Sequence, residues 1–164
     1  GVGVAALHYA VEVPRGSPSA RLMLRAIGGY FETDWSVNPH WEAEFSALPE
    51  HPVTAGIEPF AMDDEWYFNM RFQPGKQGIA PLLVAVPPAH TMERDNGPHS
   101  GNDAVRKMVA ERLPQTVAWA YEREGGGRGF GFTGGHYHAN WEIDGARKLV
   151  VNAIGWLAGV EVGE

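Results

Sequence analysis

Two short runs of apolar residues, VGVAAL (2–7) and IAPLLVAV (79–86), carry no charged or polar side chain. A half-exposed strand alternates apolar and polar residues, whereas a continuous apolar run indicates a strand buried on both faces. Strands of that kind belong to parallel sheets covered by helices on each side. The runs therefore predict an α/β domain, and the first of them ends at His8, which we place at the carboxyl end of a strand.

Helical patterns separate the predicted strands. Ser17 and Pro18 are residue types typical of an N-cap and a first helical position, and Gly28 ends the apolar stripe that follows. A short helix is predicted over 104–113. The clearest helix is predicted over 143–158, where apolar residues recur at a spacing of three to four.

The remaining strands show a different pattern. WEAEFSAL (41–48) alternates strictly, which predicts a half-exposed strand. TVAWAY (116–121) and RGFGFT (128–133) flank a run of glycines and predict a hairpin. We interpret the chain (1–164) as one domain, a three-layer α/β sandwich with a mostly parallel sheet and a C-terminal hairpin plus helix.

Composition narrows the classes of function. The net charge of −7 and the absence of a basic stripe argue against nucleic acid as a partner. The absence of cysteine excludes disulfides, thiolate metal sites and a cysteine nucleophile. No apolar stretch reaches the ~18 residues of a membrane helix, so we expect no membrane insertion and a soluble chain, cytoplasmic or periplasmic. Because the chain opens with Gly1 inside a predicted strand, we expect an upstream part to be missing.

The stretch RGFGFTGGHYHANW (128–141) is the main candidate for a site. It begins as a strand, breaks at two glycines and then presents His136. His8 follows another strand, and Glu65 lies in an acidic segment beside aromatic residues. Two imidazoles and a carboxylate are a common ligand set for a divalent ion, with zinc the first choice, and equally a set for acid–base chemistry. Spacing alone does not decide whether the three converge.

Neighbouring residues are weaker candidates for substrate binding, and each has a structural alternative. Aromatic residues near the site, including Trp66, either stack on a sugar or fill space, and acids of the DDE segment equally cap backbone N–H groups. The glycine runs match no phosphate-binding motif, so we expect no nucleotide cofactor. The candidates for substrate contact are Tyr9, Asp64, Tyr67, His99, His138 and Trp141.

Several segments together resemble the ThuA-like family, also called trehalose-utilisation proteins. The resemblance runs nearly end to end, and the segments that carry it are GVGVAALH, GGYFE, HPVTAGI, DDEWYFNM, VAWAYEREGGGRGFGFTGGHYH and NAIGWLAGVEV. The resemblance implies a flavodoxin-like α/β fold related to class I glutamine amidotransferases. It also implies that His8 stands where those enzymes keep a cysteine and His136 near their histidine. Because the chain has no cysteine, thiol-based amide hydrolysis is excluded.

Family members are associated with the use of disaccharides through keto-sugar intermediates, so the resemblance implies a small carbohydrate as partner. Three hypotheses stay open. The first is a sugar-modifying enzyme with a metal held by His8, Glu65 and His136, and the second is a metal-free acid–base enzyme using the same residues. The third is a non-catalytic carbohydrate-binding or scaffold domain of a larger protein. The sequence also leaves a homo-oligomer open.

Overall fold

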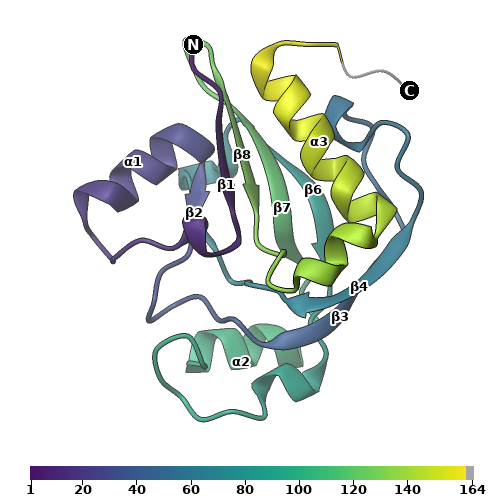
Figure 1. Cartoon of the computed structure of the whole chain (residues 1–164). Coiled ribbons are helices and arrows are strands. Elements are labelled where there is room, and N and C mark those ends of the chain that lie inside the picture. The colour runs from purple at the N-terminus through teal and green to yellow at the C-terminus, as the bar shows by residue number, and fades with distance from the viewer. Residues whose placement is uncertain (162–164) are drawn as a thin grey trace.

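The computed structural model describes residues 1–161, and its centre is a four-stranded sheet (Figure 1). The strand order is β1 (Val4–Leu7), β8 (Arg128–Phe132), β7 (Gln115–Glu122) and β6 (Ile79–Ala85). β1 runs parallel to β8, whereas β8 and β7 form the antiparallel hairpin expected from the sequence, and β6 pairs antiparallel to β7. The sheet is therefore mixed.

The expectation of a mostly parallel sheet is wrong, since only the β1–β8 pairing is parallel. Both apolar runs form the outermost strands of this sheet, where one long edge of the backbone is free of strand partners within it. Their side chains are only partly buried, since Ala5, Pro81 and Val84 are exposed, so the expectation of strands buried on both faces is wrong. A continuous apolar run therefore reports neither full burial nor the direction of the neighbouring strand. Pro81 in β6 agrees with an outer position, because proline cannot donate to a central ladder.

The expected helices are present as α1 (Pro18–Ile27), α2 (Asp103–Ala110) and α3 (Asp144–Ala158). Ser17 caps α1 by accepting a hydrogen bond from the backbone N–H of Ala20 at 3.0 Å. Short 3-10 turns complete the helical content: η1 (His8–Val11), η2 (Pro52–Thr54), η3 (Pro74–Lys76), η4 (Ala89–Met92) and η5 (His138–Glu142). None of the helices among the described residues is both long and apolar enough to cross a membrane.

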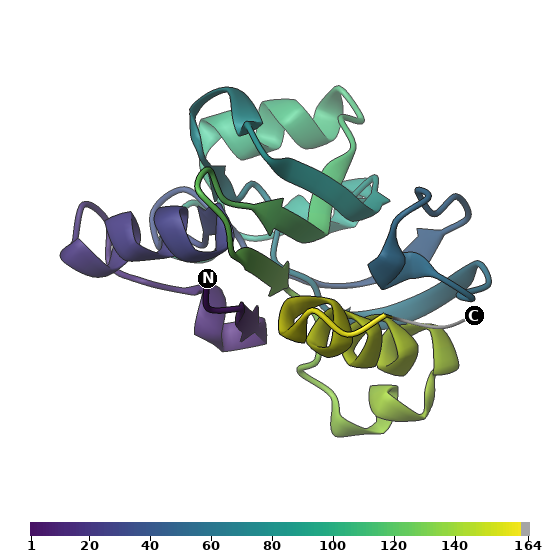
Figure 2. The same ribbon diagram turned by 90° about the horizontal axis from the view of Figure 1, so that it is seen from above.

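Helices α1 and α3 lie on opposite sides of β1 and β8 (Figures 1 and 2). The sheet separates two apolar clusters accordingly. Trp119 and Ile27 belong to the smaller cluster on the α1 side, whereas Phe130, Phe132 and Leu149 belong to the larger cluster beneath α3. The domain thus has helices on both faces of a mixed sheet.

Two antiparallel ribbons flank the main sheet. β3 (His40–Phe45) pairs with β4 (Phe60–Glu65), and β2 (Gly29–Tyr30) pairs with β5 (Arg71–Phe72). Side chains of β3 alternate between exposed and buried, as the alternation in WEAEFSAL predicts. The β3–β4 ribbon matters for function because His40 and Glu65 face each other at its end. Val162, the last residue of the NAIGWLAGVEV segment, lies outside the described residues.

Candidate functional site

His8 lies where the parallel strands β1 and β8 end side by side. Leu7 is in register with Phe132, so the next residues along each strand, His8 and Thr133, are neighbours. Nδ1 of His8 lies 3.0 Å from the carbonyl oxygen of Thr133. Because a carbonyl only accepts, Nδ1 carries the proton, and Nε2 of the neutral ring presents its lone pair to the site. His8 also has φ 48°, an unusual backbone value for a residue other than glycine.

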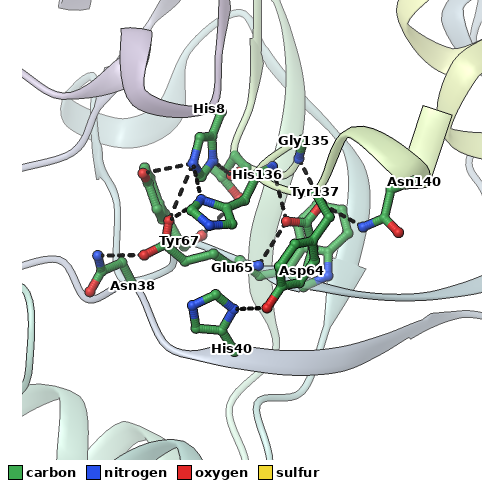
Figure 3. Close-up of polar contacts among 12 residues, drawn as sticks. His8, Asn38, His40, Asp64, Glu65, Tyr67, Gly135, His136, Tyr137 and Asn140 are labelled. Atoms are coloured by element: carbon green, nitrogen blue, oxygen red, sulfur yellow. Dashed lines mark hydrogen bonds and ion pairs between the residues drawn. The ribbon is translucent and has the colours of Figure 1, made fainter.

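Glu65 enters the site from the end of β4. Its Oε1 accepts a hydrogen bond of 2.9 Å from Nδ2 of Asn38, in the segment that leads into β3. This contact fixes the carboxylate and leaves Oε2 directed at the two imidazoles (Figure 3). Only 14% of the Glu65 side chain is exposed, so its charge acts in a partly desolvated environment.

His136 is positioned by the carboxylate of Asp64, which is fully buried. Asp64 accepts hydrogen bonds from the backbone N–H groups of Gly135 at 2.7 Å and His136 at 3.0 Å. It also accepts from the backbone N–H of Glu65 at 2.8 Å and from Nδ2 of Asn140 at 3.0 Å. One carboxylate therefore ties the loop after β8 to the end of β4 and brings His136 to Glu65.

The two glycines before His136 are needed for different reasons. A Cβ on Gly134 would come within 2.6 Å of the Trp66 ring, so the backbone passes too close for any side chain. Gly135 has φ 99°, a conformation that residues with a Cβ rarely adopt. The loop reaches Asp64 through these two positions.

His8, Glu65 and His136 converge to a single point (Figure 3). Oε2 of Glu65 lies 3.2 Å from Nε2 of His8 and 3.2 Å from Nδ1 of His136, and the two nitrogens are 3.2 Å apart. Tetrahedral zinc, with bonds of about 2.0–2.1 Å, separates its ligand atoms by about 3.3 Å. The three donors thus fit one face of a tetrahedral ion, and the group can hold a metal.

Tyr67 completes the wall behind this group. Its hydroxyl lies 3.2 Å from Nε2 of His8, and the two rings are tilted against each other with centroids 4.6 Å apart. Burial raises the pKa of Tyr67 well above its usual value, and the charge of Glu65 and a hydrogen bond to it raise the pKa further. The phenol therefore keeps its proton at neutral pH and acts as a donor.

An open pocket of about 460 Å³ lies in front of these residues. On its wall, Nε2 of His99 lies 2.8 Å from Oε1 of Glu12, and the hydroxyl of Thr33 donates to the same oxygen at 3.2 Å. The His99 ring stacks on Phe31 with centroids 5.3 Å apart. The pocket is lined by His8, Tyr9, Glu12, Asn38, Glu65, Tyr67, His99 and His136.

Comparison with known proteins identifies the family of this chain. The sequence profile of the ThuA family, described as trehalose utilisation, matches residues 1–157. The chain belongs to the ThuA family. A solved structure with the same fold is a ThuA-like protein from Bacteroides uniformis ATCC 8492, with a TM-score of 0.62 and 16% sequence identity. The alignment covers 94% of this chain but 58% of that protein, and no curated protein matches.

The other predicted substrate-binding residues of this ThuA-family chain take varied positions. Tyr9 and His99 line the pocket, whereas Asp64 is fully buried and takes the capping role that its sequence equally allowed. His138 is exposed in η5 and outside the pocket lining, and Trp141 is half-buried against Phe132. Asp64, His138 and Trp141 do not line the pocket in front of His8.

Trp66 takes the second of the two roles left open by the sequence, since it fills space. Its side chain is fully buried, and its Nε1 donates to the carbonyl oxygen of Met62 at 3.0 Å. The ring packs edge-on against Phe132 behind the site. A stacking platform that includes Trp66 is therefore ruled out.

Three residues of the site were missed by sequence reasoning in this ThuA-family chain. Asn38 holds Glu65, Glu12 holds His99, and His40 lies across from Glu65 in the ribbon with its ring 5.4 Å from that of His136. His40 follows a proline and reads as a loop residue. Its position next to the alternating strand 41–48 was the available signal, but the pairing partner of that strand was unknown.

Proposed function

We propose that this ThuA-family chain is a sugar-modifying enzyme whose site is built on His8, Glu65 and His136 and holds a divalent metal ion. The family description, trehalose utilisation, supports a role related to carbohydrate metabolism. The chain spans 58% of the length of the solved relative, so its substrate and reaction are part of the proposal. A keto-sugar or disaccharide is the substrate class that we assign.

The observation that carries this proposal is the mutual spacing of 3.2 Å among three donor atoms from distant parts of the chain. Atoms in a hydrogen-bonded cluster need not be equally far apart. The donor atoms that bind one tetrahedral ion, by contrast, lie at about equal distances from one another. Two histidines and one glutamate also form the ligand set of several catalytic zinc sites, which keep a further position for water or substrate. When bound, such an ion would polarise a sugar carbonyl or activate water.

His8, Glu65 and His136 are called the triad below. The residues around the triad supply substrate binding and proton transfer. The hydroxyl of Tyr67, kept protonated by its raised pKa, can donate to a substrate oxygen next to His8. On the pocket wall, the contact with Glu12 orients the His99 ring, so that its other nitrogen is available for a sugar hydroxyl. A pocket of about 460 Å³ falls within the size range of small-molecule sites.

Two alternative functions make chemical predictions that differ from those of this proposal. A metal-free acid–base enzyme would use the same imidazoles and keep its activity after chelation. A non-catalytic carbohydrate-binding domain would need exposed aromatic rings for stacking. The burial of Trp66 removes one of the rings on which that alternative depends.

Turnover of keto-disaccharides tests the proposal. Protein loaded with zinc is incubated with trehalose, sucrose and their keto derivatives, and products are followed by NMR. We expect conversion of a keto-disaccharide that is abolished by chelation, restored by metal, and reduced about 100-fold or more in H136A and E65Q. E42Q, on the exposed face of β3, is the matched control and should keep full activity. Activity that survives in H136A or after chelation would overturn the metal mechanism.

A further inference from the structure

A second pocket, of about 290 Å³, adjoins the triad at Glu65. It shares Asn38 and Glu65 with the pocket in front of His8. The rest of its wall comes from the start of β3 and from the loop around η4. Its lining residues are Asn38, Pro39, His40, Glu65, His90, Thr91 and Arg94.

Arg94 is the unusual member of this wall. Its Nη1 is buried and has no hydrogen-bond partner among residues 1–161. Its Nη2 makes two long contacts with neutral groups, 3.3 Å to Oδ1 of Asn38 and 3.5 Å to Oγ of Ser100. An unpartnered buried donor is costly, and more so when it belongs to a charged group. Because Nη1 has almost no exposed surface, a pocket ligand would reach it only after the guanidinium turns toward the pocket. The guanidinium lines the pocket without a carboxylate partner within 4.0 Å among residues 1–161, so a ligand oxyanion would supply the charge partner that the fold does not.

The loop that carries Arg94 is held rigidly by another arginine, Arg106 of α2. The Arg106 guanidinium donates to the carbonyl oxygen of Met92 at 2.7 Å, to the carbonyl oxygen of Arg94, and to Oδ1 of Asn96 at 2.6 Å. Two of these contacts hold the backbone at Met92 and at Arg94 itself, and the third holds the side chain of Asn96. The backbone that carries the Arg94 side chain is therefore held in place, which lowers the entropy cost of binding.

We propose that the Arg94 pocket is a subsite for an oxyanion group of the substrate, so that the enzyme acts on an acidic sugar that bears a carboxylate or a phosphate. The planar guanidinium suits such groups because its N–H donors match their paired oxygens. The imidazoles of His40 and His90 line the same pocket and can add donors. The substrate class rests on the proposed function, whereas the oxyanion preference rests on Arg94.

The carboxylate of Glu65 also lines this pocket and must be reconciled with an anionic ligand. Its Oε1 is occupied by the amide of Asn38, and its Oε2 faces His8 and His136. Both oxygens are thus engaged with donors or with the proposed metal ligands. Arg94 and Glu65 thus place opposite charges on this wall, and Arg94 is the lining arginine whose donors an oxyanion can contact.

Binding measured by calorimetry at low salt tests this subsite. Glucose, glucuronate, glucose 6-phosphate and inorganic phosphate are titrated into the wild-type chain. We expect at least one of the two acidic sugars to bind about tenfold or more tightly than glucose, as a charge-assisted hydrogen bond would provide. We also expect that affinity to fall as salt is added. Whichever acidic sugar binds with the higher affinity shows whether the pocket prefers a carboxylate or a phosphate.

Variants separate the subsite from other roles of Arg94. R94Q should remove the preference for acidic sugars by weakening their binding about tenfold more than that of glucose, and R94K should retain part of the preference because it keeps the charge without the planar fork. R25Q, which removes an exposed arginine of α1, should behave as wild type. Thermal unfolding of each variant verifies that it is folded.

Three results would overturn the proposal. Equal affinity for acidic and neutral sugars would show that the pocket takes no oxyanion. If R94Q weakened the binding of acidic and neutral sugars equally, Arg94 would only hold Asn38 and, through it, Glu65. Loss of the preference in H136A, with Arg94 intact, would place the anion on the triad. A preference that persists in H136A supports the subsite even if the proposed metal chemistry fails.

Discussion

At the scale of single residues, the buried carboxylate of Asp64 controls where His136 lies. It accepts from three backbone N–H groups and one side-chain amide, and its carboxylate is fully buried. Aspartate is suited to this position because two acceptor oxygens can serve several donors at once. The acid next to the catalytic candidate Glu65 is therefore a positioning residue, and the two neighbours in the DDE segment have different tasks.

The variant D64N tests this role. The amide keeps one acceptor oxygen and turns its NH₂ group toward N–H donors, so buried donors lose their partner. We expect the free energy of unfolding to fall by about 2–4 kcal/mol, measured by urea denaturation. D63N is the matched control, because Asp63 is exposed and only its backbone carbonyl contacts Asn140. Similar stability of the two variants would contradict the assignment.

The central residues of the candidate site could be proposed from sequence because each follows or ends a strand. His8 and His136 follow apolar strands, and Glu65 stands among aromatic residues, so simple rules about strand ends select them. Asn38 and Arg94 could not be found in this way. Their contacts cross the β3–β4 ribbon and the η4 loop, and no local pattern in the sequence shows which segments meet there.

At the scale of elements, the short β2–β5 ribbon carries a buried charge cluster. Glu32 follows β2 and receives hydrogen bonds of 2.9 Å from both Arg71 and Tyr30. Burial by itself raises the pKa of Glu32, but the hydrogen bonds from Arg71 and Tyr30, together with the charges of Arg71 and Arg15, lower the pKa below its usual value. The charged form of this glutamate is therefore the stable one in the fold.

This cluster makes stability depend on pH. Because the pKa of Glu32 is lower in the folded than in the unfolded chain, its contribution is present above the unfolded pKa of about 4.3 and is lost as pH falls through the folded pKa. We expect the free energy of unfolding to fall less steeply in E32Q than in wild type below about pH 5. Urea denaturation across that range measures the slopes. Parallel slopes for the two proteins would rule out a role of Glu32.

Helices and the hairpin were predictable because capping residues and periodicity are local. Ser17, Pro18 and Gly28 mark the two ends of α1 in the sequence as they do in the structure. The direction of strand pairing was not predictable, since a continuous apolar run reads the same in parallel and antiparallel sheets, and even in outer strands that are only partly buried. Pro81 inside the second run was the one local sign of an outer strand, and it does not indicate the direction of the neighbour.

At the scale of the whole molecule, the candidate site joins segments that are far apart in the chain. His8 comes from the end of β1, Glu65 from the end of the β3–β4 ribbon, and His136 from the loop after β8 (Figures 1 and 3). An ion bound by all three would link these elements and stabilise the native state, because the unfolded chain does not hold the three donors together.

Metal titration tests the central claim most directly. Calorimetry with zinc, supported by elemental analysis, is carried out on wild type, H8N, E65Q, H136A and the control H138A, whose exposed imidazole is two residues from His136. The structure predicts one ion per chain in wild type and in H138A, and an affinity lower by about 100-fold or more in the other three. Absence of zinc binding to wild type, or equal binding by all five proteins, would contradict the assignment of His8, Glu65 and His136 as one metal site.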